Sequence, residues 1–156
     1  MAEIRKTEVF VQWLDGLRDI QARSRVLVRI ERLATGNPGD VNMNKTVTTR
    51  YDVAEHLRTP EEMAAYLEAC LEEADGDAAF IAKALGDIAR AKGMSQVARD
   101  AGISRESLYK ALSGERVPGF DTILKVTKAL GLRLHAEAAV LSQLEASPDA
   151  QKAAYL

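Results

Sequence analysis

The stretch MSQVARDAGISRESLYKALSG, residues 94–114, decides the fold of this 156-residue chain. It predicts two short helices joined by a tight turn at Gly102, where the backbone needs a residue without a Cβ. Ser95 is suited to cap the first helix and Ser104 the second. The side chains expected to face the core are those of Ala98, Ile103, Leu108, Ala111 and Leu112. This spacing is typical of a helix-turn-helix unit.

The outer face of the second helix carries side chains that can read DNA. Arg105 can pair with the N7 and O6 atoms of guanine, Glu106 can accept from cytosine N4, and Lys110 can reach guanine or a phosphate. The amides and side chains that open the first helix are suited to phosphate oxygens. The predicted DNA-binding residues are Ser95, Gln96, Ser104, Arg105, Glu106, Ser107, Tyr109 and Lys110.

A pair of short helices that binds no DNA is the alternative interpretation of the same pattern. The charge distribution favours DNA. The whole chain has a formal net charge of −2, but residues 91–135 hold eight basic and four acidic residues, whereas residues 44–90 hold five and ten. Residues 121–131 also predict a supporting helix, capped by Asp121 and ended by Gly131. A basic module therefore follows an acidic one.

Composition excludes several classes of protein. With 47% hydrophobic and 28% charged residues, the chain has enough apolar material for a compact domain. One cysteine, Cys70, rules out an intrachain disulfide, and with His56 and His135 it gives no zinc-type cluster, so no metal or cofactor is expected. These three are interpreted as packing or surface residues. No signal peptide or membrane span is apparent, which favours a cytoplasmic protein.

Two helices are predicted at the N-terminus. The first spans residues 8–17 after a capping Thr7, and its Trp13 is expected to anchor the helix to an apolar surface. The second spans residues 20–34, and its apolar positions are Leu27, Ile30, Leu33 and Ala34. Its basic stripe is interpreted as a solvated surface, with residual nucleic-acid affinity as the alternative, and consists of Arg25, Arg29 and Arg32. A turn is predicted over residues 36–40.

The central segment predicts two more helices, one begun by Thr59-Pro60-Glu61-Glu62 and one capped by Asp77. The apolar stripe of the first consists of Met63, Tyr66, Leu67, Cys70 and Leu71. Its carboxylates are expected to be solvated, with docking of a basic partner as the alternative, and are those of Glu61, Glu62, Glu68, Glu72 and Glu73. Residues 46–49 and 132–137 have strand character and could pair across a dimer.

Three segments carry a resemblance to a known family: ALGDIARAKGMSQ (84–96), SRESLYKALS (104–113) and LKVTKALGLRLHAE (124–137). On these segments residues 43–139 resemble the HigA-like addiction-module antidote proteins, which are Xre/Cro-type helix-turn-helix antitoxins. The resemblance implies a homodimeric bacterial repressor that neutralises a partner toxin and binds its own operator.

A second resemblance concerns the N-terminus. Residues 2–41, through IRKTEVF (4–10), WL (13–14) and GNPGDV (36–41), look like the opening of the HigB/RelE-type addiction-module killer proteins. The likeness stops where the strands of that family would begin, so the chain is interpreted as a truncated toxin joined to an antitoxin. The family's catalytic part is missing, so no catalytic residue and no enzyme activity are predicted.

The sequence thus predicts a mainly α protein in three parts: a toxin-like helical hairpin (1–42), a helix-turn-helix domain (43–139) and a tail (140–156). The predicted function is a repressor that binds a palindromic DNA operator as a homodimer. The alternative is a protein-interaction module that neutralises a RelE/HigB-type toxin, with DNA binding secondary or lost. A third possibility gives the N-terminal hairpin a packing role only.

Overall fold

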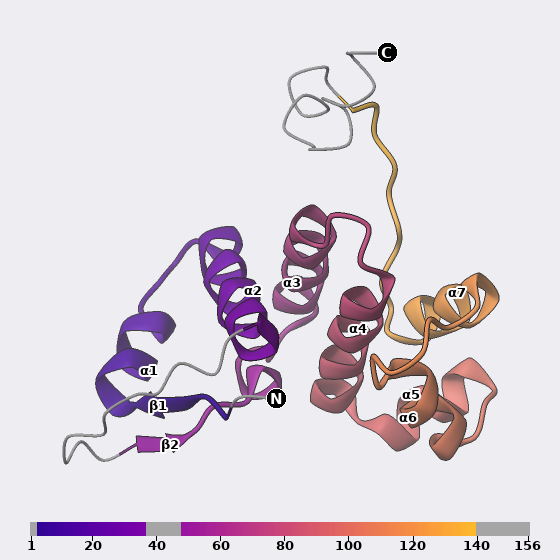
Figure 1. The fold of residues 1–156 in the computed structure, drawn as a ribbon, viewed down its shortest axis with the longest axis horizontal. Helices are drawn as coiled ribbons and strands as arrows, with labels where there is room; N and C mark the ends of the chain where they lie inside the picture. The colour runs from indigo at the N-terminus through magenta and orange to yellow at the C-terminus, as the bar shows by residue number, and fades with distance from the viewer. Residues whose placement is uncertain (1–2, 37–47, 140–156) are drawn as a thin grey trace.

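The computed structural model describes residues 3–36 and 48–139. The predicted turn after Gly36, the linker near residues 37–45 and the tail lie outside these ranges. Within them the fold is mainly helical, as predicted, with one small antiparallel sheet (Figure 1). The elements are β1 (Arg5–Thr7), α1 (Glu8–Asp15), α2 (Ile20–Gly36), β2 (Thr48–Arg50), the 3-10 helix η1 (Val53–His56), α3 (Pro60–Glu73), α4 (Ala78–Lys92), α5 (Met94–Ala101), α6 (Arg105–Leu112) and α7 (Phe120–Ala129).

The predicted helix starts are confirmed at three places. The side chain of Thr7 accepts a hydrogen bond from the Phe10 amide at the start of α1, and Asp77 does the same for the Phe80 amide in α4. Thr59 forms a full capping box with Glu62, and Pro60 occupies the first turn of α3. Each cap satisfies amide groups that the first turn of a helix leaves without a backbone partner.

The helices form one assembly with a continuous core. In Figure 1, α2 lies beside α3 on one side of the molecule, while α4 separates α3 from the group formed by α5, α6 and α7. Leu14 and Leu27 of the N-terminal helices belong to the same cluster of buried residues as Tyr66, Ile88 and Leu108. The N-terminal helices and the helix-turn-helix unit therefore share one core.

The strand expected at residues 132–137 is absent, and the predicted pairing across a dimer stays a prediction. β2 pairs with β1 of the same chain, with Arg5 opposite Arg50 and Thr7 opposite Thr48. Residues 132–137 have no regular secondary structure, and most of them are exposed. The partner of β2 is thus β1, which lies more than forty positions earlier in the sequence.

Three apolar residues are more exposed to solvent than their helical spacing predicts. Leu33 is 64% exposed and Leu71 is 48% exposed, and neither belongs to the cluster of buried residues to which α2 and α3 contribute. Trp13 is 52% exposed and packs against Phe10, with ring centroids 5.9 Å apart, on the outside of α1. The expected anchoring role of Trp13 is therefore replaced by a local aromatic pair.

Candidate nucleic-acid interface

The turn between α5 and α6 has the geometry that the sequence predicts. Gly102 adopts a left-handed conformation with φ 69°, and its N–H donates to the carbonyl groups of Ala98 and Arg99. The Ile103 N–H donates to the Ala98 carbonyl at 3.1 Å. A side chain at residue 102 would strain this backbone, so the glycine allows α5 to end and α6 to start within three residues.

Only one of the two predicted caps of the unit is confirmed. Ser104 precedes α6, and its hydroxyl accepts from the Ser107 amide at 3.0 Å. Ser95, however, lies inside α5, whose N-cap is Gly93, with no side-chain cap. Gly93 has φ 116° and donates its N–H to the Ala89 carbonyl, so it ends α4 and opens α5 at once. This close succession leaves no cap position for Ser95.

The cap expected at Asp121 is also wrong, because the N-cap of α7 is Gly119 and the helix begins at Phe120. Asp121 instead lies in the first turn, where its charge is favourable near the positive end of the helix dipole. Gly131 does end the helix, as predicted, with φ 72°. The supporting helix is therefore present with a different start.

The inner faces of α5 and α6 fix the orientation of the outer face. Val97 and Ala98 of α5 are buried, as are Leu108 and Leu112 of α6. Ile103 is only partly buried and packs at the border of the core rather than filling it. Since these contacts set the rotation of each helix, the remaining positions of α6 are turned toward solvent.

All the predicted DNA-binding residues are exposed, and the structure orders several of them. The Arg105 guanidinium lies over the Tyr109 ring, 5.4 Å from its centroid, and its Nη2 is 3.4 Å from the Tyr109 hydroxyl. The Lys110 Nζ is 3.2 Å from a carboxylate oxygen of Glu106. The eight residues, all at the surface of α5, α6 or the turn, are Ser95, Gln96, Ser104, Arg105, Glu106, Ser107, Tyr109 and Lys110.

The ion pair of Lys110 and Glu106 is weak, because the two side chains are 74% and 80% exposed. It can open at little cost when a phosphate or a base approaches. The Ser104 hydroxyl, in contrast, is engaged by Ser107 in the cap. Lys110 and Glu106 are thus available to a ligand, whereas the Ser104 hydroxyl is already used to cap α6.

One exposed cation of this surface was missed in the sequence. Arg99 donates through Nη2 to the Gln96 side-chain oxygen at 2.8 Å, and Gln96 donates to Asp100 at 2.8 Å. The spacing of Gln96 and Arg99, three residues apart on one helix, was the available signal. The two side chains present one polar surface on α5.

A buried polar network is centred on Asp87 of α4, the helix against which α5 and α6 pack. Asp87 accepts from the Tyr66 hydroxyl at 3.2 Å and from Arg90 at 2.7 Å, and the Lys83 ammonium is 3.6 Å away. Lys83 also forms an ion pair with Glu31 of α2. Burial raises the pKa of Glu31, and Lys83 offsets this only in part. This network links α2 to α4, the helix that directly precedes α5 and α6. The periodicity of apolar residues in the sequence does not indicate it.

The fold and the geometry of α5 and α6 define a mainly helical protein with a helix-turn-helix unit. The chain belongs to the family described as probable addiction module antidote protein, whose family model matches residues 47–138. It is also similar to an uncharacterized protein of Haemophilus influenzae (strain ATCC 51907 / DSM 11121 / KW20 / Rd), with 56% identity over 87 residues, which are 56% of this chain and 88% of the relative. No solved structure matches the chain.

The family match leaves out residues 1–46, so the likeness of residues 2–41 to a toxin has no support from the comparisons. An antidote family is typically non-enzymatic and implies a toxin partner. Among the residues that the structure describes, no helix has the length and apolar character needed to cross a membrane. In those same residues no group of three or more histidine, cysteine or acidic side chains could hold a metal ion.

Proposed function

We propose that this chain is a sequence-specific transcriptional repressor of toxin–antidote type that binds a palindromic DNA operator as a homodimer. The observation that carries the proposal is the outer face of α6, where Arg105, Glu106 and Lys110 are exposed on a helix whose inner face is fixed by the core. Helix-turn-helix proteins place such a helix in the major groove. Arginine and glutamate on one face can distinguish guanine from cytosine.

The short α6, from Arg105 to Leu112, can reach only a few base pairs, so a second copy is needed to extend the site. An apolar groove of about 220 Å³ between α3, α4 and α7 supports a dimer. Its rim includes the exposed side chains of Leu71, Val117, Phe120 and Leu134. Burial of this surface against a second copy would remove apolar area from water.

The proposal is tested by fluorescence anisotropy with the DNA upstream of the gene and with a shuffled duplex. The wild-type chain is expected to prefer the upstream DNA, and the double variant Arg105→Ala, Lys110→Ala is expected to lose that preference. Lys110→Ala alone should lower the slope of log affinity against log salt by about one. The matched control is Arg25→Ala, an exposed arginine of α2. Equal affinity of the wild-type chain for both duplexes would contradict the proposal.

A second function is favoured by the family match: the chain binds and neutralises a RelE/HigB-type toxin, with DNA binding secondary or lost. The exposed carboxylates of α3, among them Glu61, Glu68 and Glu72, suit a basic partner. The test is co-purification with a toxin encoded beside the gene, together with relief of growth inhibition. Toxin capture without any DNA preference would favour this function over the first.

The origin of residues 1–42 as a truncated toxin is part of the same proposal. Its support is the resemblance of residues 2–41 and the position of this segment before the matched range. As a packing element, the hairpin would keep apolar surface of the antidote domain covered. Sequencing of the neighbouring reading frames, with a search for an intact toxin gene, tests the origin directly.

A further inference from the structure

The N-terminal segment lies outside the part of the chain that matches the family and has no room in the Haemophilus influenzae relative. The family match begins at residue 47. Because 87 residues are 88% of the Haemophilus influenzae relative, that protein has about 99 residues. It is too short to hold both a unit as long as residues 47–138 and a segment as long as β1 to α2. Residues 3–36 cover part of the surface of this chain. In the relative, the corresponding surface is therefore exposed or is covered by another segment or another protein.

The first part of the covered surface is a strand edge. β1 adds to β2 in antiparallel register, with Lys6 opposite Thr49. The Tyr51 N–H donates to the Ile4 carbonyl at 2.8 Å, just beyond the strand. The Lys6 ammonium also forms an ion pair with Glu55 of η1. Without β1, the edge of β2 would present unpaired backbone groups, which readily accept a strand from another chain.

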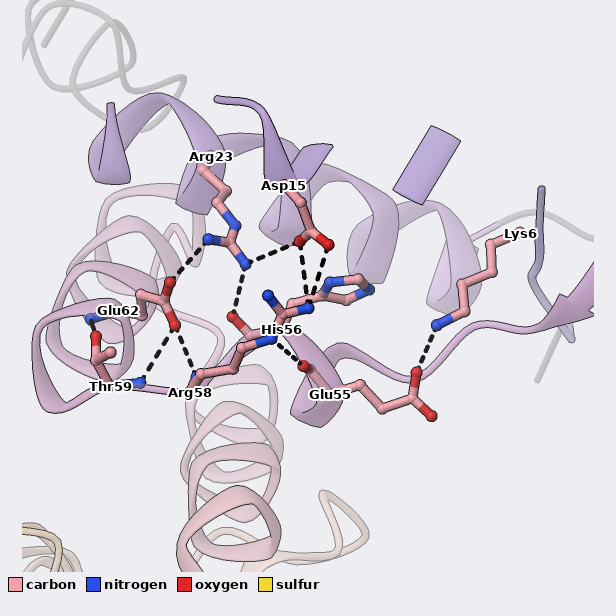
Figure 2. A network of polar contacts seen from close by, with 8 residues as sticks. All are labelled: Lys6, Asp15, Arg23, Glu55, His56, Arg58, Thr59 and Glu62. Carbon is pink, nitrogen blue, oxygen red and sulfur yellow. Dashed lines mark hydrogen bonds and ion pairs between the residues drawn. The ribbon is translucent and has the colours of Figure 1, made fainter. Parts of the chain in front are cut away.

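The second part of the covered surface is a buried site that binds the guanidinium group of Arg23. Figure 2 shows Arg23 of α2 pointing between η1 and the start of α3. Its Nη1 is 2.7 Å from the Glu62 carboxylate, and its Nη2 donates to the His56 carbonyl at 3.3 Å. Asp15 of α1 lies 3.5 Å from Arg23 and 3.2 Å from Arg58. The side chains of Arg23 and Glu62 are both largely buried, so removal of the arginine would leave a buried carboxylate without its charge partner, which costs more than the loss of a surface ion pair.

The third part is apolar. Leu27 and Val28 of α2 and Leu14 of α1 are almost completely buried, in the same core cluster as Met63 and Leu67 of α3. At the other end of the helix pair, the Arg32 guanidinium lies 4.3 Å from the centroid of the Phe80 ring. The segment thus combines a strand edge, an anchoring arginine and an apolar helix face, which are features of a specific protein interface.

We infer that the surface formed by β2, η1 and α3, here called the docking face, is where the antidote unit binds its protein partner, and that residues 3–36 occupy it within the same chain. This inference rests on the proposed antidote function and names the face that serves it. The partner is a protein that offers a strand antiparallel to β2 and an apolar helix with an arginine for Glu62. In this chain the partner must displace the built-in segment.

The test uses the full chain with a protease site introduced between residues 37 and 47. After folding, the chain is cut, and a fluorescent peptide of residues 3–36 is added in excess. The original segment is expected to stay bound after the cut and to exchange with the peptide. A peptide with Arg23→Gln should bind at least tenfold more weakly, whereas the matched control Arg18→Gln, at an exposed position just before α2, should bind like the wild type.

The second arm offers the same three peptides to the intact Haemophilus influenzae relative. Binding of the wild-type and Arg18→Gln peptides, with weak binding of Arg23→Gln, supports a docking face shared by the family. Binding to the cut chain but not to the relative overturns the inference, because the face would then be a packing surface private to this chain. Toxin capture and DNA preference are measured separately, so loss of antidote function is distinguished from failure of the docking face.

Discussion

Gly86 of α4 lies directly against Leu112 of α6. A Cβ built on Gly86 would be 2.9 Å from the Leu112 carbonyl oxygen and 3.3 Å from the Leu112 Cβ. Carbon atoms do not approach backbone oxygen this closely without displacement of one helix. The absence of a side chain at residue 86 therefore sets the distance between α4 and the helix that carries the proposed DNA-reading residues.

Gly86→Ala is expected to destabilise the chain by about 1–2 kcal/mol, because overpacking costs more than the gain in helix propensity returns. The shift of α6 should also weaken preference for the upstream DNA. Urea unfolding and fluorescence anisotropy measure the two effects. The control is Gly16→Ala, which should be less destabilising, because Gly16 has φ −74° and its Cβ would lie 3.3 Å from the nearest backbone oxygens rather than 2.9 Å. Equal stability of Gly86→Ala and wild type would contradict the prediction.

The helix-turn-helix unit could be predicted from sequence because its determinants are local. Gly102 provides the left-handed turn, Ser104 caps the next helix, and Leu108 and Leu112 are one turn apart on its inner face. Each of these features acts over a few residues, so spacing alone reveals it. The same reasoning failed at Ser95, where a preceding glycine had already fixed the helix start.

The contacts that join distant segments could not be predicted in this way. β1 pairs with β2, Arg23 meets Glu62, and Lys83 meets Glu31, all across more than thirty-five positions. The spacing of apolar residues predicts which face of a helix is buried. It does not predict which other helix or strand packs against that face. The division into hairpin and domain stays a prediction from sequence, whereas the core that the two parts share was found only in the structure.

His56 makes stability depend on pH. It is 1% exposed, its ring stacks on Tyr51, and its ring nitrogens have no hydrogen-bond partner among the described residues. Burial lowers its pKa, and the cations Lys6, Arg23 and Arg58 lower it further against the opposing charge of Asp15. The unfolded chain therefore binds a proton at His56 more readily than the folded chain does. Stability falls as the pH drops below about 6.5 toward the folded pKa.

His56→Phe keeps an aromatic ring beside Tyr51 and removes the titration. Between pH 7.5 and pH 5, the wild type is expected to lose about 1–2 kcal/mol more stability than this variant, since the slope is up to about 1.4 kcal/mol per pH unit. Urea unfolding at the two pH values gives the difference, in which contributions of unchanged carboxylates cancel. Parallel loss in both proteins would show that His56 does not titrate in this range.

Cys70 is expected to be unreactive in the folded chain. The thiol is fully buried in α3, and burial raises its pKa to about 12, so little thiolate is present at pH 8. A disulfide reagent such as DTNB should react more than about a thousandfold more slowly than with the unfolded chain. The absorbance of the released thiolate measures the rate, and the urea-unfolded protein is the control. Complete labelling within seconds in native buffer would contradict the buried position.

Tyr109 is expected to act on DNA recognition through Arg105. The Arg105 guanidinium rests on the Tyr109 ring, and this exposed contact contributes about 0.5–1 kcal/mol by holding the side chain in one orientation. Tyr109→Ala should weaken binding to the upstream DNA by roughly twofold to fivefold. Tyr109→Phe keeps the ring and should bind within about twofold of the wild type, because the hydroxyl contact to Arg105 is long, at 3.4 Å.

The matched measurement is a double-mutant cycle by fluorescence anisotropy. In the background of Arg105→Ala, Tyr109→Ala should have almost no further effect on affinity, because the arginine that the ring orients is gone. Affinity for the shuffled duplex should be similar for the wild type and Tyr109→Ala, since the ring adds no charge for phosphates. Additive losses in the cycle would instead show that Tyr109 contacts the DNA independently of Arg105.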